Sequence, residues 1–296
     1  MGRKKVIGAQ IVVDWRGEVG ASVEGSISRV FGEIVDVWLL NHFNTLVLAV
    51  VIVGSVILFA IFGSVMLRRR FHGISEGKHN ETVGVLLGVY GAIYGILLAF
   101  VVVAEWDGVD IAESVVASEA THAAEIVRGA AAFPSADRDR VIQAVGEYAR
   151  VVVNNQWPLL KKGMPDSSQS EGALKNIYQM LQGYEPDTAS EKAYYEQAVA
   201  HLDEVVSERR SRLVIAEQGL PVLLKVLIYG GALIMVSLTF FYGVRNRKAQ
   251  LMFVGSVAAL IGVSLLLTLA LDHPFAGDLS ITPAPFKQGV LAQFWN

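Results

Sequence analysis

Four long apolar runs constrain this chain more than any other feature of its sequence. They are NTLVLAVVIVGSVILFAIFGSVML (44–67), VGVLLGVYGAIYGILLAFVVVA (83–104), LPVLLKVLIYGGALIMVSLTFFYG (220–243) and AQLMFVGSVAALIGVSLLLTLAL (249–271). A helix crosses a bilayer with about 20 predominantly apolar residues. Only 18% of the residues are charged, against about 25% in soluble domains. We therefore predict an all-α membrane protein with four transmembrane helices.

A polar stretch separates the second run from the third. Residues 105–217 hold 19 acidic and 11 basic side chains, a net charge of −8. Alanine-rich helical periodicity without proline predicts that the second span continues as one long helix to Phe133-Pro134. Further helices are expected near 136–154, 172–182 and 188–217, with Trp157-Pro158 ending the first of them.

The chain is thus predicted to have five parts. They are an N-terminal extension leading into the first span (1–43), transmembrane helices 1 and 2 (44–104), an acidic helical outer domain (105–218), transmembrane helices 3 and 4 (219–271) and a C-terminal extended segment (272–296).

Two short connectors predict the orientation. Residues 68–82 carry four Lys and Arg against two Glu, and residues 244–248 carry three basic residues and no acid. Loops rich in Lys and Arg stay on the cytoplasmic side. The outer domain and both termini are therefore expected on the opposite side. Arg3, Lys4 and Lys5 argue the other way, but they lie far from the first span.

The second span carries a stripe of four glycines beside two tyrosines one turn apart. These are Gly84, Gly88, Gly91, Gly95, Tyr90 and Tyr94. Steps of four, three and four residues keep the glycines on one helix face. Close helix packing is the favoured interpretation, because small residues let backbones approach in a membrane. A pore-lining face is the alternative.

Four acidic residues, the acidic collar, follow where this span leaves the membrane. They are Glu105, Asp107, Asp110 and Glu113. Around the axis of an oligomer they would concentrate cations at the outer mouth, whereas in a single chain they are a solvated helix face. Lys225 is the one charge inside a span, and its position near the outer end favours snorkelling to the interface over a role in a pore.

Several classes of function find no support in the sequence. The absence of cysteine excludes disulfides, Cys metal sites and thiol nucleophiles. There is no phosphate-binding glycine loop or nucleophile elbow, so neither an enzyme nor a cofactor is expected. His122 with Glu119 or Glu125, and His201 with Glu204, each offer only two metal ligands at helical spacing, so no metal site is predicted. The basic tracts are topology signals, so no nucleic-acid partner is expected.

The chain leaves its last span as LDHPFAGDLSITPAPF, residues 271–286. Pro274 should stop the helix, and Phe275 and Phe286 are expected to lie back on the apolar ends of the spans. Asp272 is expected to reach an arginine at the base of the outer domain, with Arg212 the first candidate. These features predict a structural clasp between membrane and outer domain, with a gating role less favoured. Its residues are Asp272, Pro274, Phe275, Gly277 and Arg212.

Three patches together carry a family resemblance. They are EWDGVDIAESVVASEATHAAEIVRGAAAFP (105–134), EYARVVVNNQWPLL (147–160) and RRSRL (209–213), the last followed by two spans and the segment above. This order resembles the bestrophin-like DUF4239 family of bacterial membrane proteins over roughly residues 40–286. The matching outer-domain positions include Trp106, Glu119, Arg128, Tyr148 and Trp157. One departure is Asn155-Gln156, where the family pattern has an acid next to the tryptophan.

The resemblance implies a homo-oligomeric ion channel in the bacterial cytoplasmic (inner) membrane, with the lipid bilayer, further copies and inorganic ions as partners. Its selectivity is left open, because an outer charge of −8 opposes the anion selectivity that the family name suggests. The alternative is a non-conducting envelope sensor or scaffold whose outer helical domain binds a ligand or a partner.

Overall fold

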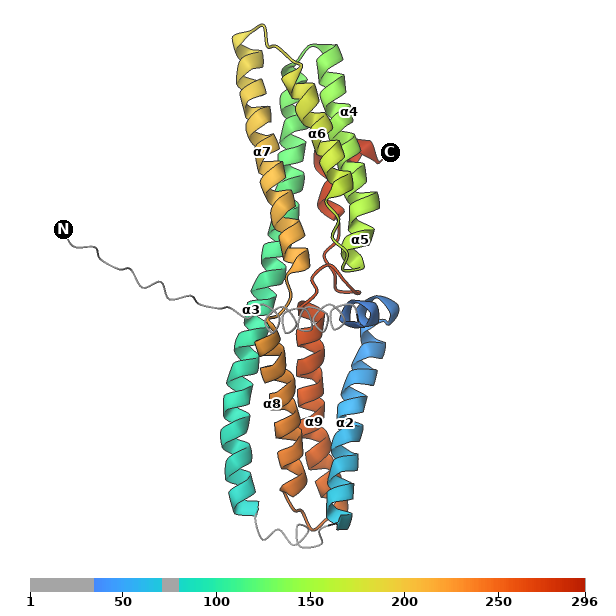
Figure 1. Ribbon diagram of the computed structural model, residues 1–296, viewed down its shortest axis with the longest axis vertical. Coiled ribbons are helices and arrows are strands. Elements are labelled where there is room, and N and C mark those ends of the chain that lie inside the picture. The colour runs from blue at the N-terminus through green and yellow to red at the C-terminus, as the bar shows by residue number, and fades with distance from the viewer. Residues whose placement is uncertain (1–34, 71–79, 296) are drawn as a thin grey trace, which may run out of the picture.

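The computed structural model describes residues 35–70 and 80–295. Residues 1–34 of the predicted N-terminal extension and most of the basic 68–82 connector lie outside the described residues. Figure 1 shows an elongated molecule of two helical bundles, one above the other, with α3 (Asn80–Gly129) running through both.

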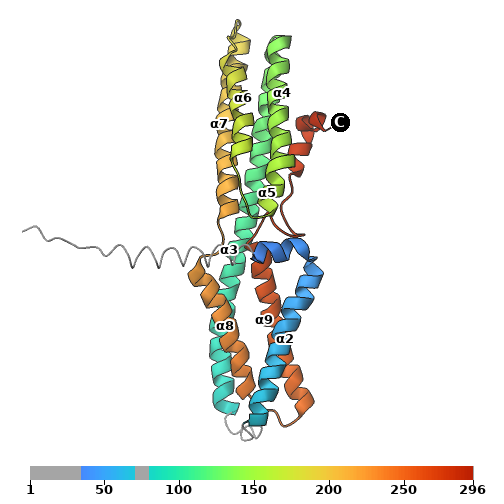
Figure 2. The same ribbon diagram turned by 45° about the vertical axis from the view of Figure 1, so that its right-hand side comes forward.

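The lower bundle contains four helices that are long and apolar enough to cross a membrane. They are α2 (Thr45–Arg70), the first part of α3, α8 (Val222–Phe241) and α9 (Arg247–Leu271). Helix α2 packs chiefly along α9, and α3 packs against α8 and α9 (Figure 2). Leu98, Ile228 and Ala258 lie in the shared core. The predicted four-helix membrane architecture is confirmed.

Helix α3 has 50 residues and continues without a break from the second span into the upper bundle. Its sequence contains no proline, and alanine is the commonest residue of its upper half. The helix ends in one 3₁₀ turn, η2 (Ala130–Ala132), before Pro134. The predicted long helix is therefore confirmed, and a span and an outer-bundle helix are mechanically one rod.

The upper bundle surrounds the second half of α3. It contains α4 (Ser135–Val151), α6 (Ser168–Gln182) and α7 (Ala189–Glu217). The side chain of Thr188 caps α7 by accepting a hydrogen bond from the Glu191 N–H at 3.1 Å. Helix α7 ends at Glu217, and residues 218–221 join it to α8. A connected apolar core fills the bundle.

The expected helix break at Trp157-Pro158 is wrong. Helix α4 passes into one π-helical turn, η3 (Val152–Gln156), and then into α5 (Trp157–Lys161). The Trp157 N–H bonds to the Val152 carbonyl, five residues back. Pro158 lies in the first turn of α5, where an intrahelical N–H is not needed, and the widened turn accommodates its ring.

The C-terminal segment packs on the upper bundle. It contains two 3₁₀ helices, η4 (Ala284–Lys287) and η5 (Gly289–Phe294). Phe286 is fully buried there, and the ring of Phe275 meets Trp157 edge-on at 5.8 Å between centroids. The expectation that Phe275 and Phe286 lie on the ends of the spans is therefore wrong. A dry aromatic core removes these rings from water, whereas the span ends border the interface.

Candidate functional site

One side of the membrane part of α3 is uncovered in a single chain. We call it the open face of α3. Its small residues are Gly88, Ala92, Gly95 and Ala99, all exposed. Its bulky residues are Val89, Ile93, Ile96 and Phe100, with exposed fractions of 50–73%. The opposite side, with Tyr94 and Leu98, packs in the core of the membrane bundle.

The predicted glycine stripe is divided between two surroundings. A Cβ atom at Gly91 would lie 3.3 Å from Met235 Cε, and one at Gly84 would lie 3.8 Å from the Tyr242 ring. A Cβ atom at Gly88 or at Gly95 would have no neighbouring atom within 4 Å. Two glycines therefore face α8 or its end, and two belong to the open face.

The two predicted tyrosines also differ. Tyr94 is buried and donates its hydroxyl hydrogen to the Ile228 carbonyl at 2.9 Å. Its ring lies against Gly231, where any Cβ would be only 2.5 Å away. Tyr90 is 44% exposed. Tyr94 thus fixes α3 on α8, and Gly231 is required for that close approach.

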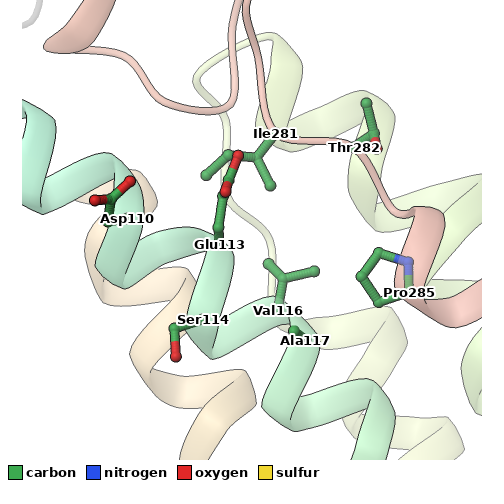
Figure 3. Close-up of a pocket in the computed structure, with 8 residues that line it drawn as sticks. All are labelled: Asp110, Glu113, Ser114, Val116, Ala117, Ile281, Thr282 and Pro285. Atoms are coloured by element: carbon green, nitrogen blue, oxygen red, sulfur yellow. The ribbon is translucent and has the colours of Figure 1, made fainter.

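The acidic collar is split as well. Asp107 is exposed one turn above Val103, on the side of the open face. Asp110 and Glu113 line a groove of about 470 Å³ between α3 and the C-terminal segment. Figure 3 shows Glu113 pointing toward Ile281 of that segment. Glu105 is half-buried on the other side of the helix, so Asp107, Asp110 and Glu113 are the exposed members of the collar.

Glu105 instead faces a set of charged residues where the two bundles meet, which we call the junction cluster. Its members are Asp36, Glu105, Lys225, Asp272 and His273. Lys225 Nζ lies 2.8 Å from Asp272 Oδ2, and the Leu220 N–H donates to Asp272 Oδ1 at 2.5 Å. His273 Nε2 lies 3.9 Å from Asp272 Oδ2 and 4.0 Å from Asp36 Oδ2.

The expected pairing of Asp272 with Arg212 is therefore wrong. Asp272 follows the end of α9 and holds the first residues of the α8 segment, whereas Arg212 lies higher, inside the outer bundle. The partner of Asp272 is Lys225, and this salt bridge lies at the edge of the membrane. Gly277, with φ +81°, lets the chain turn closely past Leu40, and Pro274 accepts a hydrogen bond from the Ile281 N–H.

Within the junction cluster, the carboxyl group of Glu105 titrates near neutral pH. Burial raises the pKa of its carboxyl to about 7, and the Asp272 carboxylate adds to the rise, while His273 and Lys225 oppose it. In the unfolded chain a glutamate carboxyl has a pKa of about 4.3. The folded state therefore binds this proton more tightly than the unfolded state does. The protonated Glu105 carboxyl stabilises the fold at low pH, and this stabilisation is lost as the pH rises through about 7.

We expect Glu105→Gln to flatten the pH dependence of the thermal unfolding midpoint between about pH 5 and pH 8. The amide stays neutral, so it does not acquire the buried charge that the carboxyl acquires as the pH rises. Unfolding of the purified protein followed across this range measures the slope, with the exposed Asp110→Asn as the matched control. An unchanged slope in Glu105→Gln would contradict the assignment.

A buried polar network joins α3, α4 and α7 in the outer bundle. Arg212 donates to Glu119 from Nε at 2.7 Å and from Nη2 at 3.1 Å, and both side chains are fully buried. Tyr148 donates to Glu119 Oε1 at 2.5 Å. Burial and the adjacent carboxylate raise the pKa of Tyr148 well above its usual value. The hydroxyl therefore stays protonated and donates to Glu119.

Gln156 completes this network, and the sequence reasoning missed it. Its Oε1 accepts from Arg212 Nη2 at 2.7 Å, and its Nε2 donates to Ser170 Oγ at 2.9 Å. Arg209 Nε also donates to Ser170 Oγ, at 2.8 Å. A signal was present in the sequence, because Gln156 stands where the resemblance leads one to expect an acid. A neutral amide can both accept from Arg212 and donate to Ser170.

The remaining family-matched residues occupy different surroundings. The Trp157 indole is buried, donates to the Ile281 carbonyl at 3.3 Å and lies 5.5 Å from the Arg212 guanidinium. Arg128 pairs with Glu125 on the surface, and Trp106 is 57% exposed. Within residues 35–70 and 80–295, no group of three or more His, Asp or Glu side chains is placed so that it could hold one metal ion.

Comparisons with known proteins agree with this architecture. The sequence matches the bestrophin-like domain family over residues 44–286. A crystal structure of a bacterial bestrophin homologue from Klebsiella pneumoniae, with an isoleucine-to-threonine mutation, has a TM-score of 0.66 at 11% identity, covering 82% of this chain and 99% of the homologue. A leucine-to-threonine mutant has a TM-score of 0.64 at 12% identity, with coverage of 82% and 97%. No curated protein matches the chain.

Proposed function

Because this chain belongs to the bestrophin-like family, we propose that it assembles with further copies of itself into an ion channel whose pore is lined by the open face of α3. The observation that carries this proposal is the uncovered face itself. It combines exposed small residues with a row of exposed bulky ones on a helix that also forms part of the outer bundle.

The small residues favour contact with other copies over contact with lipid. Small side chains at a membrane interface allow helix backbones to approach, and Gly88 and Gly95 leave space that nothing in one chain fills. In a ring of subunits, Ile96 and Phe100 beside them would form an apolar constriction around the axis.

The charges above this constriction favour cations. Asp107, Asp110 and Glu113 follow the open face along the same helix and are exposed. Repeated around an axis, they would produce a negative potential at the mouth of the pore. By the distribution of basic residues in the short connectors, this mouth and the outer domain lie on the extracytoplasmic side of the bacterial cytoplasmic membrane.

Reconstituted protein is expected to conduct and to prefer cations. In a tenfold salt gradient, a fully cation-selective pore has a zero-current potential of about 59 mV. We expect the triple variant Asp107→Asn, Asp110→Asn and Glu113→Gln to move that potential toward zero by tens of millivolts, on the order of half the ideal value. Planar-bilayer recordings of the wild type and the variant measure the shift.

A matched control removes three other carboxylates far from the proposed axis, with Glu171→Gln, Glu185→Gln and Glu196→Gln. These residues are exposed in the outer bundle, and their removal should leave the zero-current potential unchanged. An equal shift in both triple variants would contradict a local role of the collar. A silent wild-type protein would contradict the channel and favour the non-conducting sensor.

A further inference from the structure

Two histidines meet where α3 packs against α7 in the outer bundle. His122 on α3 and His201 on α7 are 79 residues apart in sequence, and their Nδ1 atoms lie 3.0 Å apart. The ring centroids are 5.3 Å apart and the ring planes are inclined by 34°. Both side chains are partly exposed, so solvent and small ions can reach them.

The Nδ1 atom of each ring points into the space between the two rings. A hydrogen bond between the two atoms needs a proton on one of them and a lone pair on the other. If both rings carry their proton on Nε2 instead, two lone pairs converge there. This is the donor arrangement that neutral imidazoles present to a metal ion.

The separation suits a divalent transition metal. Zinc binds imidazole nitrogen at about 2.0–2.1 Å, so tetrahedral ligands lie about 3.4 Å apart. The rings therefore need to separate by only a few tenths of an ångström from 3.0 Å. Imidazole donors favour ions such as Zn²⁺ and Cu²⁺ over Mg²⁺ and Ca²⁺, which prefer oxygen.

The surroundings leave the remaining ligand positions to water. Among the described residues, no third His, Asp or Glu already completes a ligand group. Glu125, one turn beyond His122, is paired with Arg128, and Glu208, further along α7, accepts a hydrogen bond from Ser118. Glu204, one turn beyond His201 on α7, is exposed and adds negative charge that favours a cation.

We propose that His122 and His201 form a two-histidine binding site for a divalent transition-metal ion, which would cross-link α3 to α7. Helix α3 continues into the membrane, and α7 precedes α8 by only residues 218–221. Such a cross-link would stiffen the two elements that lead from the outer bundle into the spans. The proposal does not depend on whether the protein conducts ions.

Zinc titration of the full chain tests the site. The protein should carry no histidine tag, be purified in detergent and be treated with a chelator before Zn²⁺ is added in a calorimeter. We expect one Zn²⁺ per chain and a rise in the thermal unfolding midpoint. His122→Ala and His201→Ala should each weaken binding at least about tenfold. His42→Ala is the matched control, since His42 is exposed and far from the pair in the outer bundle, and it should bind as the wild type does.

Electron paramagnetic resonance of Cu²⁺ bound to the wild type keeps the test independent of how the variants fold. The expected spectrum shows coupling to two imidazole nitrogens. Absence of binding, fewer than two coupled nitrogens, or unchanged Zn²⁺ affinity in the double variant His122→Ala with His201→Ala would each overturn the proposal.

Discussion

Replacing Arg212 by methionine is expected to lower the free energy of unfolding by about 3–5 kcal/mol, because it leaves the Glu119 carboxylate buried without its cation. The pair is fully buried, with Nε and Nη2 of Arg212 both donating to Glu119. A loss of this size should lower the thermal midpoint by on the order of 10 °C. Thermal unfolding of the purified protein measures it.

Two controls separate loss of the ion pair from loss of packing. Arg128→Met removes the surface pair with Glu125 and should cost less than about 1 kcal/mol. The double variant Glu119→Leu with Arg212→Met removes both charges and should recover part of the stability. Full recovery is not expected, because Tyr148 and Gln156 lose their hydrogen-bond partners. An Arg212→Met protein as stable as Arg128→Met would contradict the role of the network.

Cysteine modification on the open face of α3 is the second large expected effect. The chain has no cysteine, so Ile96→Cys introduces a single thiol. A water-soluble cationic thiosulfonate reagent should then reduce conductance by about an order of magnitude or more, because it adds bulk and charge at a narrow apolar constriction. Current through reconstituted channels before and after the reagent measures the block.

Leu58→Cys is the matched control on α2. Leu58 is 68% exposed in a single chain, close to the 60% of Ile96, but we place it toward lipid. A thiol in lipid stays protonated and should not react, since the thiolate is the reactive form. Equal block at both positions, or none at Ile96→Cys, would contradict the assignment of the open face to the pore.

The sequence was sufficient to predict features that depend on local pattern. The four spans and the 50-residue α3 follow from apolar runs and from helical periodicity without proline, and the structure contains them. Arg212, in contrast, was expected to pair with Asp272, and the structure pairs it with Glu119 instead.

Features that depend on tertiary register could not be predicted. Whether Asp272 reaches Arg212 or Lys225 depends on how far α7 and α8 are offset along the molecule, which spacing within one helix does not determine. The continuation of the helix through Pro158 depends on one π turn, which has no clear sequence signal. The approach of His122 to His201 depends on the register between α3 and α7, 79 residues apart.

The arrangement of α3 in the assembled protein tests the central claim most directly. Single-particle imaging of the full chain in lipid nanodiscs would show both the number of copies and the direction of the open face. We predict a symmetric ring with Ile96 and Phe100 of every copy turned to the central axis and Asp107 at its outer mouth. A monomer, or a ring in which these residues face lipid, would contradict the claim.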